Sequence, residues 1–102
     1  MNVLTLIQRH PLLHADLKNL GLGSGALSAL ASSLTTQLGG DPGKNLCFVL
    51  SALNCQEFVR IVSAAEVAAE AGISPTLART AVATIAPWVD RFEMQEIGIN
   101  VK

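Results

Sequence analysis

Hydrophobic residues recur every three or four positions along most of this chain, which is the spacing of one face of an α-helix. The clearest stripe comprises Leu27, Leu30, Ala31, Leu34 and Leu38. A broader apolar arc from Leu77 to Phe92 predicts the longest helix, which should begin at Pro75. Between them, Lys44–Leu53 is apolar on nearly every side. Because a helix that is apolar all round is buried, this segment is expected to be the central element.

Prolines and glycines divide the first part of the chain into short helices. The helix that begins near Val3 should end before Pro11, because the residue that precedes a proline avoids the α region. Pro11 can then open a second helix that reaches Leu20. The glycine-rich loop Gly21–Gly25 follows, and its Ser24 is the expected N-cap of the next helix.

The second part of the chain twice places a cap residue three positions before a glutamate: Asn54 before Glu57, and Ser63 before Glu66. This spacing marks a helix N-terminus, because each of the two side chains can hydrogen-bond the backbone amide of the other residue. The first pair should open a helix over Phe58–Val62. Because the second pair follows so soon, it implies a sharp change of direction near Ser63.

Two similar helix–turn–helix units, Leu27–Leu53 and Ser63–Phe92, align at an offset of 33 residues. The aligned positions are Gly39 with Gly72, Asp41 with Ser74, and Pro42 with Pro75. In both units the glycine can end one helix in a left-handed conformation, the Asp or Ser can cap the next helix, and the proline suits its first position. The shared residues therefore specify how the chain turns.

Half of the 102 residues are hydrophobic, but only 4% are aromatic. Apolar content of this alanine-rich kind favours close packing of helices over sheets, and this length suits one domain. We therefore expect an all-α fold, with one domain over residues 1–102 forming a small orthogonal bundle of about six short helices. The bundle should include two helix-turn-helix-like hairpins. Residues 93–102 alternate apolar and polar positions, which is typical of an extended C-terminal tail.

Charged residues make up 15% of the chain, and the net charge is −1; the charged fraction is below the roughly 25% of ordinary globular domains. The charges are scattered singly, without a basic stripe for phosphate backbones. No apolar run approaches the roughly 20 residues that a membrane span needs, and Met1–His10 lacks the features of a secretory signal. A soluble cytoplasmic protein is the expectation.

The segment from Asn19 to Gly40 contains no charged residue. Opposite its apolar stripe lie small polar residues: Ser28, Ser32, Ser33, Thr35, Thr36 and Gln37. A solvent-facing helix usually carries charges, so this face is either solvated through its hydroxyls or covered by something. The second explanation makes Ser28, Ser32, Thr35 and Thr36 a candidate interaction face. The leading hypothesis is accordingly a protein–protein interaction or self-assembly module, with a protein partner or a homo-oligomer.

The segment Ala64–Ile85 resembles a helix-turn-helix DNA-binding unit, with Gly72 in the turn. The second helix of such a unit enters the major groove, and its outward residues contact bases. The outward candidates here are Thr76, Arg79, Thr80 and Thr84. Only Arg79 among them can bind guanine in a bidentate manner. Because the chain offers little positive charge for phosphates, DNA binding is the less favoured alternative.

Patterns typical of catalysis or of cofactor binding are weak. Gly39–Lys44 is one residue short of a phosphate-binding loop, and capping explains its glycines better. His10 and His14 lie four positions apart, but no third metal ligand is evident, so a surface histidine pair is the expectation. Cys47 and Cys55 lack the spacing of a metal or redox motif. We expect no enzymatic activity, cofactor, metal or small-molecule substrate.

The stretches Leu34–Pro42 and Val67–Pro75 resemble the repeat of the YidB-like family, in which a Leu- and Ala-rich helix ends at Gly-x-[Asp/Ser]-Pro. Ala86-Pro87-Trp88 is similar to the helix-ending proline position of that family. The resemblance covers about half of the chain. It implies a bacterial all-α protein of unknown function and brings no catalytic residues.

Overall fold

The computed structural model of this chain describes residues 3–39 and 54–90. Within these ranges the six helices are α1 (Val3–Arg9), α2 (Pro11–Asn19), α3 (Ser24–Gln37), α5 (Cys55–Ile61), α6 (Ala64–Ala71) and α7 (Pro75–Val89). The described ranges contain no strand, which confirms the expected all-α class. The expectations for a central Lys44–Leu53 helix and for the tail 93–102 lie outside the described residues.

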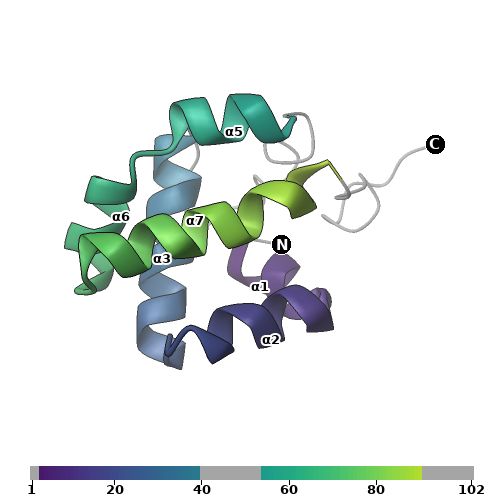
Figure 1. Ribbon diagram of the computed structural model, residues 1–102, viewed down its shortest axis with the longest axis vertical. Helices are drawn as coiled ribbons and strands as arrows, with labels where there is room; N and C mark the ends of the chain where they lie inside the picture. The colour runs from purple at the N-terminus through teal and green to yellow at the C-terminus, as the bar shows by residue number, and fades with distance from the viewer. Residues whose placement is uncertain (1–2, 40–53, 91–102) are drawn as a thin grey trace.

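Helices α3 and α7 organise the packing. Helix α3 contacts α1 and α6, whereas α7 contacts α2, α5 and α6, so that α6 joins the two. Figure 1 shows the axes of α3 and α7 running in clearly different directions, with α5 and α2 on opposite sides of α7. Each of these two long helices therefore has neighbours on more than one side.

The two predicted apolar stripes form the core. On α3, Leu27, Leu30, Ala31 and Leu34 are buried, and Leu38 packs partly buried against them. On α7 the buried residues are Ala78, Ala81, Val82, Ile85, Ala86 and Val89. Phe58 of α5 is the largest fully buried side chain. The helical periodicity thus identified the inward faces of both long helices.

The break between α1 and α2 lies where the sequence places it. His10 is extended and precedes Pro11, which is the first residue of α2. The expected cap at Ser24 is wrong, because Gly23 is the N-cap and Ser24 is the first residue of α3. The carbonyl of Gly23 already accepts the amide hydrogen of Leu27 at 2.9 Å, so the helical hydrogen bonds begin one residue earlier than predicted.

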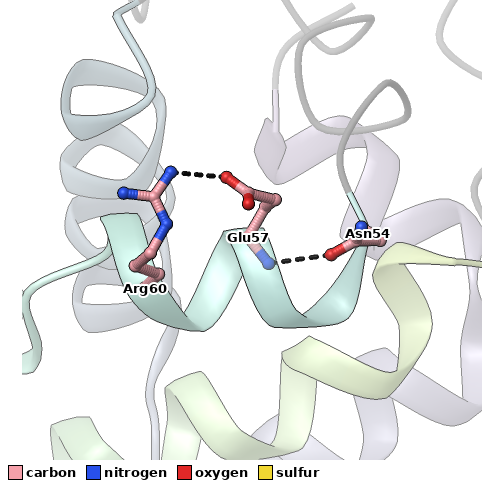
Figure 2. A network of polar contacts seen from close by, with 3 residues as sticks. All are labelled: Asn54, Glu57 and Arg60. Atoms are coloured by element: carbon pink, nitrogen blue, oxygen red, sulfur yellow. Dashed lines mark hydrogen bonds and ion pairs between the residues drawn. The ribbon is translucent and has the colours of Figure 1, made fainter.

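The caps of α5 and α6 are confirmed by their hydrogen bonds. The side-chain oxygen of Asn54 accepts the amide hydrogen of Glu57 at 2.8 Å, as Figure 2 shows. The hydroxyl oxygen of Ser63 accepts the amide hydrogen of Glu66 at 3.4 Å. Helix α5 begins at Cys55, earlier than the expected Phe58, because a helix starts directly after its N-cap.

The junction between α6 and α7 also follows the sequence signals. Gly72 ends α6 with a left-handed backbone at φ 67° and ψ 34°. The hydroxyl of Ser74 accepts the amide hydrogen of Leu77 at 3.1 Å and caps α7. Gly39, the aligned residue of the other unit, has φ 86°, which is also left-handed. The two units therefore share their helix-ending glycine in conformation as well as in sequence.

A side-chain contact that the sequence analysis did not anticipate fixes the turn between α5 and α6. The amide oxygen of Gln37, at the end of α3, accepts the backbone N–H of Ser63. The amide nitrogen of Gln37 donates to the carbonyl of Ser63 at 3.3 Å and to the hydroxyl of Ser33 at 3.0 Å. Because both backbone groups of Ser63 are satisfied by one side chain, the expected change of direction there is anchored to α3.

Candidate functional site

The polar face of α3 is only partly accessible. Ser28 and Thr36 are exposed, and Ser32 is half-buried. Thr35 is 3% exposed and Ser33 is fully buried, so Thr35 cannot belong to an outward interaction face and that expectation is wrong. The physical reason is that α3 packs against α1 and α6 on different sides, which leaves a narrow strip at the surface.

The absence of charge on α3 has an explanation inside the fold. A charged side chain is seldom buried without a partner, whereas a hydroxyl can be buried if it is hydrogen-bonded. The hydroxyl of Thr35 donates to the carbonyl of Ala31 at 2.9 Å, and that of Ser33 accepts from Gln37. The uncharged residues of α3 therefore suit a helix covered by its own chain, and an external partner is not needed to explain them.

The outward face of α7 carries the residues that the sequence analysis assigned to it. Thr76, Arg79 and Thr80 are exposed, and Thr84 is half-buried. The hydroxyl of Thr80 donates to the carbonyl of Thr76 at 3.0 Å, and that of Thr84 donates to the carbonyl of Thr80 at 2.8 Å. The hydroxyl hydrogens of Thr80 and Thr84 are thus already used in hydrogen bonds within α7. Arg79 is the strongest hydrogen-bond donor left on this face.

Arg79 differs from the arginine on the neighbouring helix. Arg60 forms an ion pair with Glu57 one turn away on α5, which Figure 2 shows. The guanidinium of Arg79 has no hydrogen bond or ion pair with the residues that the structure describes. Among the described residues, Arg79 is therefore an exposed cation without a counter-charge, whereas the arginine of α5 has one.

Arg79 lines an apolar groove between α5 and α7. The groove has a volume of about 220 Å³. Its lining residues, called the α5–α7 groove below, are Val59, Val62, Ala64, Arg79, Val82 and Ala83. Val59 is 53% exposed, which makes it one of two large hydrophobic residues exposed in the described part of the chain.

The geometry of α5 explains why the groove exists. The amide of Cys55, at the start of α5, donates to the carboxylate of Asp90, just after the end of α7, at 3.0 Å. Val62, which directly follows α5, lines the same groove as Arg79 in the first half of α7. The two helices therefore run antiparallel (Figure 1). Phe58 of α5 is fully buried, whereas its neighbour Val59 is exposed, and the sequence analysis did not predict this exposed valine.

The two histidines lie in different surroundings. The ring of His10 is half-buried and lies against Trp88, with ring centroids 5.6 Å apart. His14 lines a separate cavity. In the described ranges no group of three or more His, Cys, Asp or Glu residues could hold a metal ion. Cys55 carries a free thiol, and Cys47 lies outside the described residues.

None of the described helices combines the length and the apolarity that crossing a membrane requires. No protein-family model matches the chain, and neither the curated proteins nor the solved structures give a match. The resemblance to the YidB-like family therefore stays a prediction.

Proposed function

We propose that this chain is a protein–protein interaction module and that the α5–α7 groove is its binding surface. The observation that carries the proposal is an apolar groove lined by the exposed Val59 and by Arg79, which has no partner among the described residues. The complementary partner is a protein segment with small apolar side chains and a carboxylate. We further propose the bacterial cytoplasm as its location.

The apolar contact and the arginine have different roles in this proposal. Covering a valine side chain contributes up to about 1.5–3 kcal/mol. An ion pair at a solvated rim contributes about 0.2–1 kcal/mol. Burial of Val59 should therefore supply most of the affinity, and Arg79 should select the charge and the orientation of the segment. A groove lined by six residues suits a transient complex, because stable interfaces involve about 20–30 residues on each partner.

Selection from a displayed library of random peptides tests the proposal without a known partner. We expect the selected peptides to combine apolar residues with Asp or Glu. Val59→Asp should abolish their binding, and Arg79→Glu should change the selection toward basic peptides. Leu12→Asp is the matched control, since Leu12 is 70% exposed on α2, far along the chain from the groove.

Two outcomes contradict this assignment. Peptides that bind Val59→Asp as well as the unmodified chain would place the binding surface elsewhere. Sedimentation equilibrium that reveals a dimer, lost in Val59→Asp and kept in Leu12→Asp, would make the occupant a second copy of this chain instead of a partner segment.

DNA binding is the second candidate function. The observation that favours it is the α6–α7 hairpin with its left-handed Gly72, which leaves Thr76, Arg79 and Thr80 exposed on the second helix. A pool of oligonucleotides should then shift in a gel at about 50 mM salt, where phosphate contacts are strong. Arg79→Ala should remove the shift, and no shift at this salt concentration would end the idea.

Arg79 takes part in both proposed functions, so variants at other positions are needed to separate peptide binding from DNA binding. Thr80→Asp adds an exposed carboxylate to the outward face of α7, where it would repel DNA phosphates; position 80 does not line the groove and, as the next residue after Arg79, does not face it on the helix. It should weaken DNA binding and leave peptide binding unchanged. Val59→Ser should weaken peptide binding and leave DNA binding unchanged.

A further inference from the structure

The α5–α7 groove offers few hydrogen-bonding groups to a bound segment. Five of its six lining residues are valines or alanines, and Arg79 is the sixth. Backbone groups of the turn between α5 and α6 are already paired. The N–H of Val62 donates to the carbonyl of Phe58 at 3.0 Å. The N–H and the carbonyl of Ser63 both bind the side chain of Gln37. The lining can therefore recognise apolar side chains and a negative charge, but it offers little to a peptide backbone.

This lining is unfavourable for a segment bound in an extended conformation. An extended segment carries N–H and C=O groups along both of its edges, and each group placed against an apolar wall without a partner costs free energy. Proteins that bind extended segments often supply partners from a sheet edge, but the described ranges contain no strand. Grooves for polyproline segments are lined by aromatic side chains, and none of the described lining residues is aromatic.

An α-helix avoids this cost, because it pairs its backbone groups internally and presents side chains to the groove. The lining residues also have the spacing of helix surfaces. Val59 and Val62 lie three positions apart on one side of the groove, and Arg79 and Val82 do so on the other. Because α5 and α7 run antiparallel (Figure 1), rows of side chains from a third helix can pack between them. The two lining alanines are small, which lets such a helix approach closely.

We infer, on the basis of the binding function proposed above for this groove, that the bound segment is an amphipathic α-helix of a partner protein. Its contact face carries Ala or Val at positions i, i+3 and i+4, and Asp or Glu one turn further along. Small side chains suit a groove of about 220 Å³. The carboxylate complements Arg79, which is exposed and has no counter-charge among the described residues.

Selection from two displayed peptide libraries tests this conformation. The first has a helix-forming background randomised at i, i+3, i+4 and i+7, and its peptides have about 15 residues because shorter isolated helices are marginal in water. The second has the same length but carries proline at every third position, which prevents a helix. We expect the first library to yield peptides that bind the unmodified chain and do not bind Val59→Asp. The second library should yield none.

A proline substitution in one selected peptide then tests whether the peptide is helical when bound. Proline at a central, solvent-facing position of the peptide should weaken binding about a hundredfold, because an interior proline breaks a helix. Alanine at the same position is the control and should leave the affinity unchanged. The α-carbon chemical shifts of the labelled peptide in the complex should be those of a helix.

A variant of the chain tests the close approach of the bound helix. Ala83→Leu fills the groove from α7 and should weaken the selected peptide at least about tenfold. The core is spared because Ala83 is exposed. Ala69→Leu on α6 is the matched control, since Ala69 is also an exposed helical alanine but does not line the groove. Circular dichroism checks that each variant keeps the helical content of the unmodified chain.

The outcomes separate the helical partner from the binding function itself. If only the proline-containing library yields peptides whose binding depends on Val59, the groove binds a protein segment but that segment is not helical. An unchanged affinity after the central proline substitution leads to the same conclusion. If neither library yields a peptide whose binding depends on Val59, both the helical partner and the proposed function of the groove are wrong.

Discussion

Helices α3 and α7 both carry threonines on their polar faces, but helix packing buries one of these faces and exposes the other. The hydroxyl of Thr35 on α3 and those of Thr80 and Thr84 on α7 all donate to the carbonyl four residues earlier. Thr35 is nonetheless buried, whereas Thr80 is exposed. A hydroxyl that satisfies its hydrogen on its own helix tolerates both environments. The neighbours of a helix therefore decide which of its polar faces remains available for function.

The same comparison applies to charge. Neither α3 nor the outward face of α7 carries an ion pair within the described ranges. Helix α3 has no charged residue to form one, and apart from exposed positions such as Ser28 and Thr36 it is largely covered by its own chain. On α7, Arg79 is exposed and has no partner among the residues that the structure describes. A lack of charge thus indicated burial on one helix, and a single unpaired charge indicated a candidate binding surface on the other.

The strongest test of this difference in burial is to place a charge at Thr35 on α3 and at Thr80 on α7. Thr35→Asp should lower the free energy of unfolding by about 3 kcal/mol or more, because it buries a carboxylate without a cationic partner. Thr80→Asp should cost less than about 1 kcal/mol at its exposed position. Urea denaturation measures both values. Equal costs for the two variants would contradict the burial of the α3 face.

The next largest effect is expected at the contact that holds α6 to α3. Gln37→Ala should lower the free energy of unfolding by about 2 kcal/mol, since it leaves the backbone groups of Ser63 without their side-chain partner. Gln56→Ala on the exposed face of α5 is the matched control and should change the stability by less than about 0.5 kcal/mol. If both substitutions have the same small effect, α3 is not anchored through Gln37.

The smallest effect compares how the two helices begin. Ser74→Ala removes the N-cap hydrogen bond of α7 and should cost about 1 kcal/mol in unfolding free energy. Ser24→Ala removes no cap hydrogen bond from α3, so its effect should stay within about 0.5 kcal/mol. Thermal or urea unfolding checks the pair. A cost at Ser24 as large as that at Ser74 would restore the cap that the sequence suggested.

Much of the fold could be predicted because its signals are local. Pro11, Gly72 and Ser74 mark helix ends through their own backbone preferences and side-chain hydrogen bonds, which need no distant residue. The apolar stripes of α3 and α7 were visible for the same reason. The one misplaced cap, Ser24, lies in a loop with three glycines nearby, where several residues could begin a helix.

The candidate sites were harder to predict. The sequence placed Arg79 on the outward face of α7, and the structure agrees. It could not predict that Val59 lies beside Arg79, because the groove joins residues 20 positions apart through the antiparallel packing of α5 and α7.

By itself, the sequence determined most helix ends of the described ranges and which face of each long helix is apolar, although the starts of α3 and α5 lie earlier than predicted. These properties depend on residues within one or two helical turns. Only the tertiary structure decided that Thr35 is inside, that Arg79 lacks a partner in the described ranges, and that Gln37 holds Ser63. Those outcomes depend on which helices pack together. The repeated Gly and Pro turns end and begin helices but do not specify their neighbours, which follow from the packing that buries the most apolar surface.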